Sequence, residues 1–354
     1  MDDFTPLDIE RALSHDTLTP QDFAALLSPT AAPFLEAMAE KAHETTRRHF
    51  GNTVVLFTPL YLSNYCENTC AYCSFGAHQP IKRQQLSFDE VEAEARAIAA
   101  TGLRHILLLT GESRAKAPPA YLKECVIRLK EHFSSISIEV YPLQTEEYAE
   151  LVRAGVDGLT IYQETYDEKS YRALHTRGPK ADYTFRLTAP ERALSAGVRQ
   201  VTLGPLLGLH EPVSEIYATG LHLRRLQERF PEAETALSLP RLRPLVSEFK
   251  AASPVNDRQF VQYLCACRLF APSSGITVST RESREFRDRI LPLGVTKMSA
   301  GVSTSVGGRA SDGSTGQFEI SDTRSVAEMK TGLKNNGYQP ILCDWHHQLT
   351  ERAP

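Results

Sequence analysis

The feature that most limits the possible folds of this 354-residue chain is an alternation that repeats along most of its length. Short apolar runs typical of strands are followed by segments with the period of amphipathic helices. The strand-like runs are 53–59, 104–110, 135–141, 158–164, 199–205, 235–241, 275–281 and 295–301. Strands that alternate with helices predict parallel pairing through right-handed crossovers. Over about 250 residues, eight such units favour an α/β fold closed as a (β/α)8 barrel of the TIM type, with an open doubly wound sheet as the alternative.

The clearest helix signal is the sequence SFDEVEAEARAIAATG at 87–102. Ser87 has the character of an N-cap, and Glu90 three residues later completes a capping box. Gly102 follows the last residue of the apolar period, where helices commonly end. The sequence therefore predicts a helix between the first two strands.

The two ends of the chain do not follow the alternation. Residues 1–50 have a polar, helical pattern and predict an N-terminal helical extension before a barrel at 51–305. From 306 a loop rich in Gly and Ser precedes a helical pattern near SVAEMKTGLKNNG, which predicts a C-terminal capping segment at 306–354. We expect both terminal segments to help cover the mouth of the barrel.

Composition and charge exclude several classes of function. The net charge of −4 provides no basic surface for nucleic acid or an anionic membrane. The N-terminal sequence MDDFTPLDIE is acidic and lacks the apolar core of a signal peptide. The longest aliphatic run, 106–109, is far too short to span a bilayer. We therefore expect a cytoplasmic protein.

Three of the seven cysteines fall within eight residues, in the sequence CENTCAYC. Cys66, Cys70 and Cys73 have the spacing C-x3-C-x2-C and follow the first predicted strand, where the loops of such a barrel build the active site. An odd number of cysteines argues against a secreted disulfide framework. The remaining cysteines fit buried small apolar residues: Cys125, Cys265, Cys267 and Cys343.

Three thiolates so close together favour a metal centre, and two kinds are considered. With His78 as a fourth ligand, the cysteines could form a Cys3His zinc site. A [4Fe–4S] cluster held by three cysteines instead leaves one iron without a protein ligand, and that iron can bind a small molecule. No second cysteine pair of the kind that completes many zinc sites is present, which favours the cluster.

The C-x3-C-x2-C motif, with Tyr72 just before the last cysteine, closely resembles the radical S-adenosylmethionine (radical SAM) superfamily. In that superfamily the open iron binds the amino and carboxylate groups of S-adenosylmethionine (SAM). The resemblance implies that Cys66, Cys70 and Cys73 hold a [4Fe–4S] cluster and that Tyr72 packs near the adenine of SAM.

Three further stretches resemble the superfamily's SAM-binding motifs, in the right order along the chain. LTGESR follows the second strand, IYQETY the fourth and LGPLLGLHE the fifth. The first matches a GGE motif with Thr for Gly, and the last matches G-x-I-x-G-x-x-E with Leu for Ile. The resemblance assigns SAM binding to Thr110, Gly111, Glu112, Gln163, Glu164, Gly204, Leu206, Gly208 and Glu211. Taken alone, the first is more often a strand-end turn, and the carboxylate of the second would as readily cap a helix.

The stretches SLPRLRP, STRES, MSAG and QFEISD resemble the aromatic amino-acid lyase branch of the superfamily, over roughly residues 50–345. Within that branch, the chain is most similar to the tyrosine lyases of thiamine biosynthesis, which form 2-iminoacetate. The maturase of iron-only hydrogenase also cleaves tyrosine, but its C-terminal extension carries a second cysteine-ligated cluster, whereas Cys343 stands alone here. A lyase acting on tryptophan or another aromatic amino acid is an alternative, although GYQPILCDWHH and PRLRP favour the tyrosine enzyme.

The resemblance also implies a reaction and its partners. One electron reaches SAM through the cluster, and a 5′-deoxyadenosyl radical then takes a hydrogen atom from the amine of L-tyrosine. The Cα–Cβ bond breaks, giving dehydroglycine and p-cresol. The implied partners are a flavodoxin or ferredoxin as electron donor and a complex with thiazole synthase.

A zwitterionic substrate needs a fixed cation for its carboxylate, and the planar fork of arginine suits that task. The resemblance to the lyases makes Arg281 the first candidate, with Ser299 as a further hydrogen-bond donor. Arg241 and Arg243 follow the sixth strand, and we expect Arg241 to enter the site while the other forms a salt bridge at the rim. Tyr61 is a candidate to line the substrate pocket, although core packing would explain it equally well.

Two hypotheses from other classes are also considered. In the first, the chain is a non-catalytic iron–sulfur or zinc protein that uses the barrel as a binding scaffold. In the second, it is a radical SAM enzyme acting on a peptide. Such enzymes often carry extra cysteine-rich or peptide-recognition domains, and the sequence shows neither.

Overall fold

A computed structural model describes residues 3–243, 246–310 and 314–343. Its parallel strands close into a barrel because β1 (Thr53–Ser63) pairs both with β2 (His105–Thr110) and with β8 (Lys297–Ser299). The strands between them follow in chain order: β3 (Ser135–Glu139), β4 (Gly158–Glu164), β5 (Gln200–Pro205), β6 (Glu234–Ser238) and β7 (Gly275–Val278). The predicted (β/α)8 barrel is confirmed, and the open doubly wound sheet is wrong.

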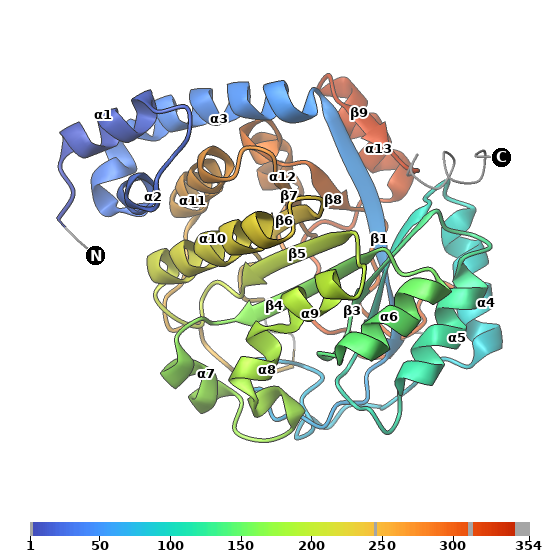
Figure 1. Cartoon of the computed structure of the whole chain (residues 1–354). Coiled ribbons are helices and arrows are strands. Elements are labelled where there is room, and N and C mark those ends of the chain that lie inside the picture. Colours follow the sequence, from blue (N-terminus) through green and yellow to red (C-terminus); the bar gives the residue numbers. More distant parts are fainter. Residues whose placement is uncertain (1–2, 244–245, 311–313, 344–354) are drawn as a thin grey trace.

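Helices surround these strands on the outside (Figure 1). They are α4 (Phe88–Ala99), α5 (Pro119–Leu129), α6 (Thr145–Ala154), α7 (Glu168–Leu174), α8 (Tyr183–Leu187), α9 (Ala189–Ser195), α10 (Pro212–Arg229), α11 (Asp257–Phe270) and α12 (Arg284–Ile290), with the 3-10 helices η2 (Pro179–Ala181) and η3 (Leu291–Leu293). The start of α4 confirms the predicted capping box, since Ser87 N–H donates to Glu90 Oε2 at 2.7 Å. None of the helices in the described ranges is long and apolar enough to cross a bilayer.

The N-terminal helices lie away from the mouth of the barrel. They are α1 (Pro6–Ser14), α2 (Pro20–Leu27), η1 (Pro29–Phe34) and α3 (Leu35–Phe50). α2 and α3 pack against α10, α11 and η3, and the Phe23 ring of α2 stacks on Phe270 of α11 at 4.1 Å. In Figure 1, α3 reaches the start of β1, whereas the loop after β1 lies at the opposite end of the barrel. The expectation that residues 1–50 cover the mouth is therefore wrong, because their apolar faces are buried on the outer helices.

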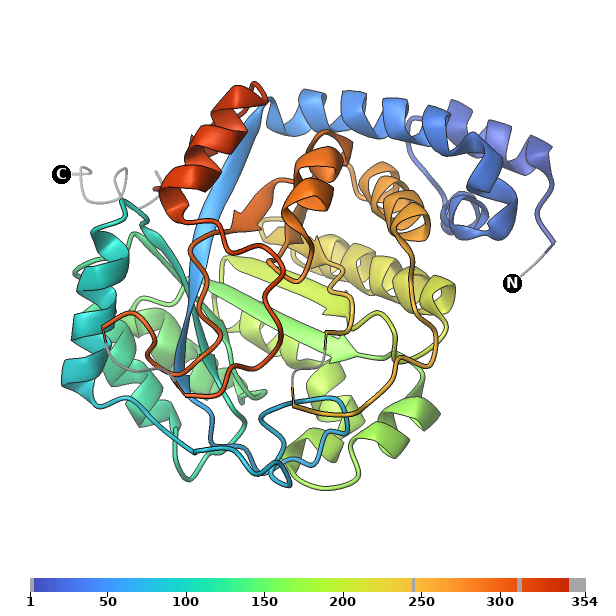
Figure 2. The ribbon, with the colours of Figure 1, turned by 180° about the vertical axis from the view of Figure 1, so that it is seen from behind.

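The C-terminal segment does return to the barrel. After β8 the chain crosses toward the carboxyl ends of the strands (Figure 2), where Val306 forms a parallel bridge with Tyr61. It then forms α13 (Val326–Asn335) and a short ninth strand, β9 (Gln339–Ile341), which pairs with the start of β1. The sequence did not predict β9. The proposed domain boundaries at 50/51 and 305/306 stay a prediction.

Candidate functional site

The three clustered cysteines lie on the loop that follows β1, at the carboxyl end of the barrel. In the described part of the chain, no three His, Cys, Asp or Glu side chains are grouped so that they could hold one metal ion, and His78 is exposed. The cysteines of a [4Fe–4S] cluster bind different irons, so this donor set fits the cluster better than the zinc alternative. Burial raises the pKa of all three thiols, to about 11 for Cys73, and each loses its proton when it binds iron.

Asn68 fixes the loop between the cysteines to two other elements. Its side-chain amide donates to Oε2 of Glu112, a residue just after β2, at 2.9 Å. Its carbonyl oxygen accepts from the backbone N–H of Lys180, in η2, also at 2.9 Å. Gly111 lets the loop approach closely, because a Cβ at this position would lie 2.3 Å from the carbonyl oxygen of Tyr65. The loop is therefore held in place by protein contacts.

Four buried charges surround this loop, and we call them the paired cluster: Glu112, Glu164, Lys180 and Arg186. Lys180 Nζ lies 2.7 Å from Glu164 Oε1, and Arg186 Nη1 lies 2.8 Å from Glu112 Oε1. Two longer contacts close the ring: Lys180 to Glu112 at 3.8 Å and Arg186 to Glu164 at 3.6 Å. Each charge therefore has two partners of opposite sign.

The paired cluster stays ionised despite its burial. Burial alone would raise the pKa of Glu112 and Glu164, but Arg186 and Lys180 lower both values below the ordinary range. Burial opposes the charges on Lys180 and Arg186 as well, yet the two glutamates raise both pKa values. Glu164 also has a φ of 70°, the one positive value found for a non-glycine residue in the described chain. Such strained positions are found disproportionately at functional sites.

Tyr72 and Leu206 form an apolar surface beside the cysteines, packed with Cys70 and Leu209. The Tyr72 hydroxyl lies 2.8 Å from His175 Nε2, while His175 Nδ1 lies 2.8 Å from the carbonyl oxygen of Tyr171. Burial lowers the pKa of His175 to about 3, so the ring is neutral. Nδ1 therefore donates to the carbonyl and Nε2 accepts from Tyr72, which fixes the Tyr72 ring.

The remaining predicted SAM-binding residues divide into two groups. Gly204 lets β5 approach β6, since a Cβ there would lie 1.9 Å from Ser238 O, and Gly208 begins the turn toward α10. Glu211 is exposed and caps α10, accepting hydrogen bonds from the N–H groups of Val213 and Ser214 at 3.0 and 2.7 Å. Glu211 therefore has a structural role as the N-cap of α10, and it lines neither of the cavities described below.

Thr110 is the last residue of β2 and Gln163 the second-last residue of β4, and neither lines one of the two cavities described below. Thr110 Oγ1 and Gln163 Nε2 are both buried, and neither has a hydrogen-bond partner among the residues that the structure describes. Buried polar atoms normally have partners, so these two are available to a ligand.

Two neighbouring cavities that share lining residues lie at the carboxyl ends of the strands. The mouth cavity lies beside the cysteine loop and is lined by Tyr72, Cys73, Glu164, Lys180, Leu206, Pro240, Leu242 and Arg243. The lumen cavity extends into the barrel and is lined by Phe57, Pro59, Tyr61, Leu107, Leu109, Thr277, Ser279, Thr280, Ser299 and Val302. Residues that line both are Glu139, Tyr162, Arg281, Gln317 and Phe318. The mouth cavity thus contains cysteine and paired charges, and the lumen cavity is mostly apolar.

Comparison with known proteins identifies this arrangement. The Radical SAM superfamily matches residues 60–221, and the Biotin and Thiamin Synthesis associated domain matches residues 238–339. The 2-iminoacetate synthase of Escherichia coli (strain K12) is 42% identical over 347 residues, which cover 98% of this chain and 92% of that protein. The chain belongs to the 2-iminoacetate synthase family.

Solved structures agree with this family. The FeFe-hydrogenase maturase HydG from Carboxydothermus hydrogenoformans is 31% identical, with a TM-score of 0.89 over 96% of this chain and 80% of that chain. Methylornithine synthase (PylB) is 22% identical, with a TM-score of 0.76 over 94% of this chain and 97% of that chain, and shows the shared fold. As a member of the 2-iminoacetate synthase family, the chain is a radical SAM carbon–carbon lyase whose cofactors are a [4Fe–4S] cluster and SAM. The hypothesis of a non-catalytic binding scaffold is wrong.

The 2-iminoacetate synthase fold places three of the predicted substrate residues around the lumen cavity. The Arg281 guanidinium stacks 3.7 Å from the centre of the Phe318 ring, and its side chain forms no ion pair within the described ranges. Ser299 Oγ is buried and has no hydrogen-bond partner there either. Tyr61 donates its hydroxyl to Gln317 Oε1 at 2.8 Å. Arg281 and Ser299 are thus left available to a ligand.

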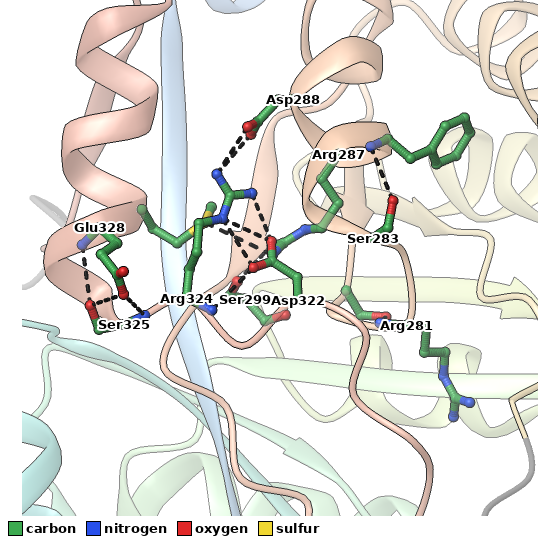
Figure 3. Close-up of polar contacts among 12 residues, drawn as sticks. Arg281, Ser283, Arg287, Asp288, Ser299, Asp322, Arg324, Ser325 and Glu328 are labelled. Atoms are coloured by element: carbon green, nitrogen blue, oxygen red, sulfur yellow. Dashed lines mark hydrogen bonds and ion pairs between the residues drawn. The ribbon is translucent and has the colours of Figure 1, made fainter.

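Ser299 is held from behind by a buried ionic network (Figure 3). Arg287 is fully buried and donates to the Ser299 carbonyl oxygen at 2.6 Å and to Asp322 Oδ2 at 2.5 Å. Asp322 also pairs with Arg324 at 2.7 Å, and Arg324 pairs with Asp288 at 2.9 Å. Figure 3 shows Arg281 pointing away from this network. The network ties the C-terminal segment to β8 and fixes the backbone that carries Ser299.

The structure places Arg241 elsewhere than predicted. Its guanidinium pairs with the buried carboxylate of Glu282 and with Asp257 at 2.7 Å, and it lines neither cavity. Arg243, two residues later, lines the mouth cavity instead. The spacing did locate both arginines after β6, but it did not indicate which one turns inward.

Several residues of the site were missed from the sequence. They are Asn68, Glu139, Tyr162, His175, Lys180, Arg186, Gln317 and Phe318. Glu139 could have been found, because it lies near the end of the predicted strand 135–141 and the carboxyl ends of barrel strands carry catalytic residues. Lys180 lies in η2 and Arg186 in α8, two short helices between β4 and β5, where no spacing pattern in the sequence marks them.

Proposed function

We propose that this chain cleaves the Cα–Cβ bond of L-tyrosine, giving 2-iminoacetate (dehydroglycine) and p-cresol for the thiazole ring of thiamine. The observation that carries the proposal is the lumen cavity of this 2-iminoacetate synthase family member. Apolar walls there surround the Arg281 guanidinium and the Ser299 hydroxyl, which have no ion-pair or side-chain hydrogen-bond partner among the described residues. That combination suits an amino acid with an aromatic side chain.

Residues in and around the mouth cavity would hold the cofactors. Cys66, Cys70 and Cys73 would bind the [4Fe–4S] cluster, and Tyr72 and Leu206 would pack against the adenine of SAM. The available atoms of Thr110 and Gln163 would donate to the polar groups of SAM. When bound, the cluster and SAM supply the 5′-deoxyadenosyl radical that removes a hydrogen atom from the substrate.

In the lumen, Arg281 binds the substrate carboxylate through two parallel N–H donors. Ser299 Oγ donates a further hydrogen bond to that carboxylate, and Arg287 keeps Ser299 in place. The α-amino group then lies toward the mouth cavity, where the reactive end of the cofactor would be. The apolar wall that includes Leu107 and Leu109 receives the aromatic ring.

Gln317 and Phe318 close the space between the two cavities from the C-terminal segment. Phe318 covers Arg281, and Gln317 binds Tyr61, so this segment excludes water from the reacting groups. Removing the segment from residue 306 onward should increase SAM cleavage that yields no p-cresol. Unchanged coupling of the two products would contradict this role.

An anaerobic assay tests the proposal. The protein is reconstituted with iron and sulfide and given SAM, dithionite and tyrosine, with tryptophan in a parallel reaction. We expect p-cresol and 5′-deoxyadenosine from tyrosine, and neither product from Cys70→Ala. 5′-Deoxyadenosine without p-cresol would leave the radical SAM chemistry in place and contradict the substrate. A tryptophan-derived product would favour the alternative lyase.

We also propose the surroundings in which the enzyme works. A flavodoxin or ferredoxin supplies the electron, since exposed Glu67 beside Cys66 leaves the cluster loop reachable from outside. Thiazole synthase receives 2-iminoacetate directly, because an imine of this kind hydrolyses easily in water. Both partners place the reaction in the cytoplasm. Co-purification with thiazole synthase, and electron transfer from each reduced donor, test these points.

A further inference from the structure

Glu139 is the last residue of β3, and it lies where the two cavities meet, because it lines both of them. The hydrogen atom that leaves the substrate must lie beside the cofactor, so the reacting part of tyrosine belongs at this junction. Arg281 also lines both cavities. A carboxylate bound by Arg281 places the α-amino group, one carbon away, beside Glu139.

Glu139 differs from the other two glutamates at these strand ends. Glu112 and Glu164 accept short contacts from Arg186 and Lys180. The Glu139 carboxylate makes no hydrogen bond or ion pair with any residue in 3–243, 246–310 or 314–343. A largely buried carboxylate without a partner is expected to serve a ligand that brings the missing donor.

We propose that Glu139 is the base that takes a proton from the α-ammonium of tyrosine before the hydrogen atom is removed. This inference rests on the proposed function. An O–H bond forms on Glu139 as one N–H bond of the ammonium breaks, and nitrogen keeps the electron pair. The ammonium and carboxylate thus become an amine and a carboxylic acid, with no change in oxidation state. The amine then loses a hydrogen atom more readily, because a neutral nitrogen radical remains, whereas the ammonium would leave a radical cation.

The surroundings of Glu139 suit a base that works near neutral pH. Burial raises its pKa to about 7, while Arg281 opposes the rise. The charged and titratable groups that face it from other elements are Arg281, Glu164, Arg186, Lys180, Tyr61 and Tyr162. Glu139 can therefore accept a proton during turnover and release it to solvent when the products leave.

The test measures p-cresol and 5′-deoxyadenosine from the reconstituted holoenzyme between about pH 6 and pH 9. The variants are Glu139→Gln and Glu139→Asp. Glu150→Gln is the control, because Glu150 is exposed on α6 of the same βα unit, outside both cavities. We expect the wild-type p-cresol rate to rise through about pH 7 and then level off. Glu139→Gln should form p-cresol about 100-fold more slowly at pH 7 and still form 5′-deoxyadenosine. Its rate should keep rising with pH, since the substrate must then lose its proton to solvent.

Several results would overturn the inference. If the p-cresol rate of the wild-type enzyme is flat from pH 6 to pH 9, the inference is wrong, even if Glu139→Gln fails to fold. If Glu139→Gln forms as much p-cresol as the wild-type enzyme, the inference is also wrong. A raised KM for tyrosine with an unchanged pH profile would assign Glu139 to positioning only. By contrast, wild-type enzyme that makes 5′-deoxyadenosine and no p-cresol would contradict the proposed function itself.

Discussion

Two sets of polar side chains lie side by side at the carboxyl ends of the strands, and they are satisfied in opposite ways. On the cofactor side, Glu112, Glu164, Lys180 and Arg186 neutralise one another through contacts as short as 2.7 Å. On the substrate side, Glu139, Arg281 and Ser299 have no ionic or side-chain hydrogen-bond partner within the described ranges. The protein alone satisfies the charges on the cofactor side, whereas the polar groups on the substrate side need a ligand to satisfy them.

The paired cluster is complete before any cofactor binds. Its contacts to Asn68 fix the cysteine loop, so the cofactor side is preorganised by the protein. The lumen instead keeps a cation, an anion and a hydroxyl for a substrate that carries complementary groups. Such unpaired groups cost stability in the free enzyme, a common feature of active sites.

Breaking the paired cluster should have the largest effect. In Arg186→Met, the distant Lys180 is the one charged partner left to Glu112 among the described residues, and removing one partner of a buried pair typically costs about 3–5 kcal/mol. We expect a lower Tm and the loss of both p-cresol and 5′-deoxyadenosine, because the cysteine loop loses its support. Arg172→Met is the control, since Arg172 forms an exposed pair with Glu168. A variant that keeps its Tm and loses p-cresol alone would contradict this division.

The network behind Ser299 provides the next test. Asp322→Asn leaves the buried Arg287 without its charge partner, which should cost about 3 kcal/mol in stability. Because Arg287 holds the backbone of Ser299, KM for tyrosine should rise more than kcat falls. Asp288→Asn, which affects only the outer pair with Arg324, is the matched control. An unchanged KM in Asp322→Asn would show that the network serves stability alone.

The two sides should also respond to pH in opposite directions. The pKa of Glu112 and of Glu164 lies below the unfolded value of 4.5, so their stabilisation is present above that pH and is lost as pH falls through the lowered values. Glu139 has a raised pKa of about 7, so ionising it destabilises the fold as pH rises from about 4.5 to 7. Glu139→Gln should therefore stabilise the protein at pH 8 by about 1–3 kcal/mol, with no gain at pH 4. Thermal melts at both pH values measure this, and a lower Tm at pH 8 would contradict it.

Much of the fold could be predicted because its signals are local. All eight barrel strands were located from apolar runs, and α4 from a capping box that the structure contains. β9 was missed because its three residues include Pro340 and carry no apolar run. The position of the N-terminal helices was also missed, since it depends on which outer helix offers a complementary face, such as Phe270 to Phe23.

The site was predictable only where a short motif carries it. The cysteine loop and the residues around Glu112 and Glu164 are contiguous stretches that follow strands. Lys180 and Arg186 reach the same point from a separate segment, and only the closed barrel brings them to Glu112. Arg241 and Arg243 were harder to assign. Both follow β6, and their spacing does not determine which side chain points into the barrel. Arg241 points elsewhere because it pairs with Glu282, a contact that the sequence does not reveal.

The most direct test of the central claim is the ratio of p-cresol to 5′-deoxyadenosine in Arg281→Lys, measured against wild type in the same anaerobic reaction with tyrosine. If the cofactor side and the substrate side are separate, the variant still cleaves SAM. The loss of two parallel hydrogen bonds to the carboxylate should then lower the ratio by about tenfold or more. A parallel loss of both products, or an unchanged ratio, would contradict the division of the barrel that we describe.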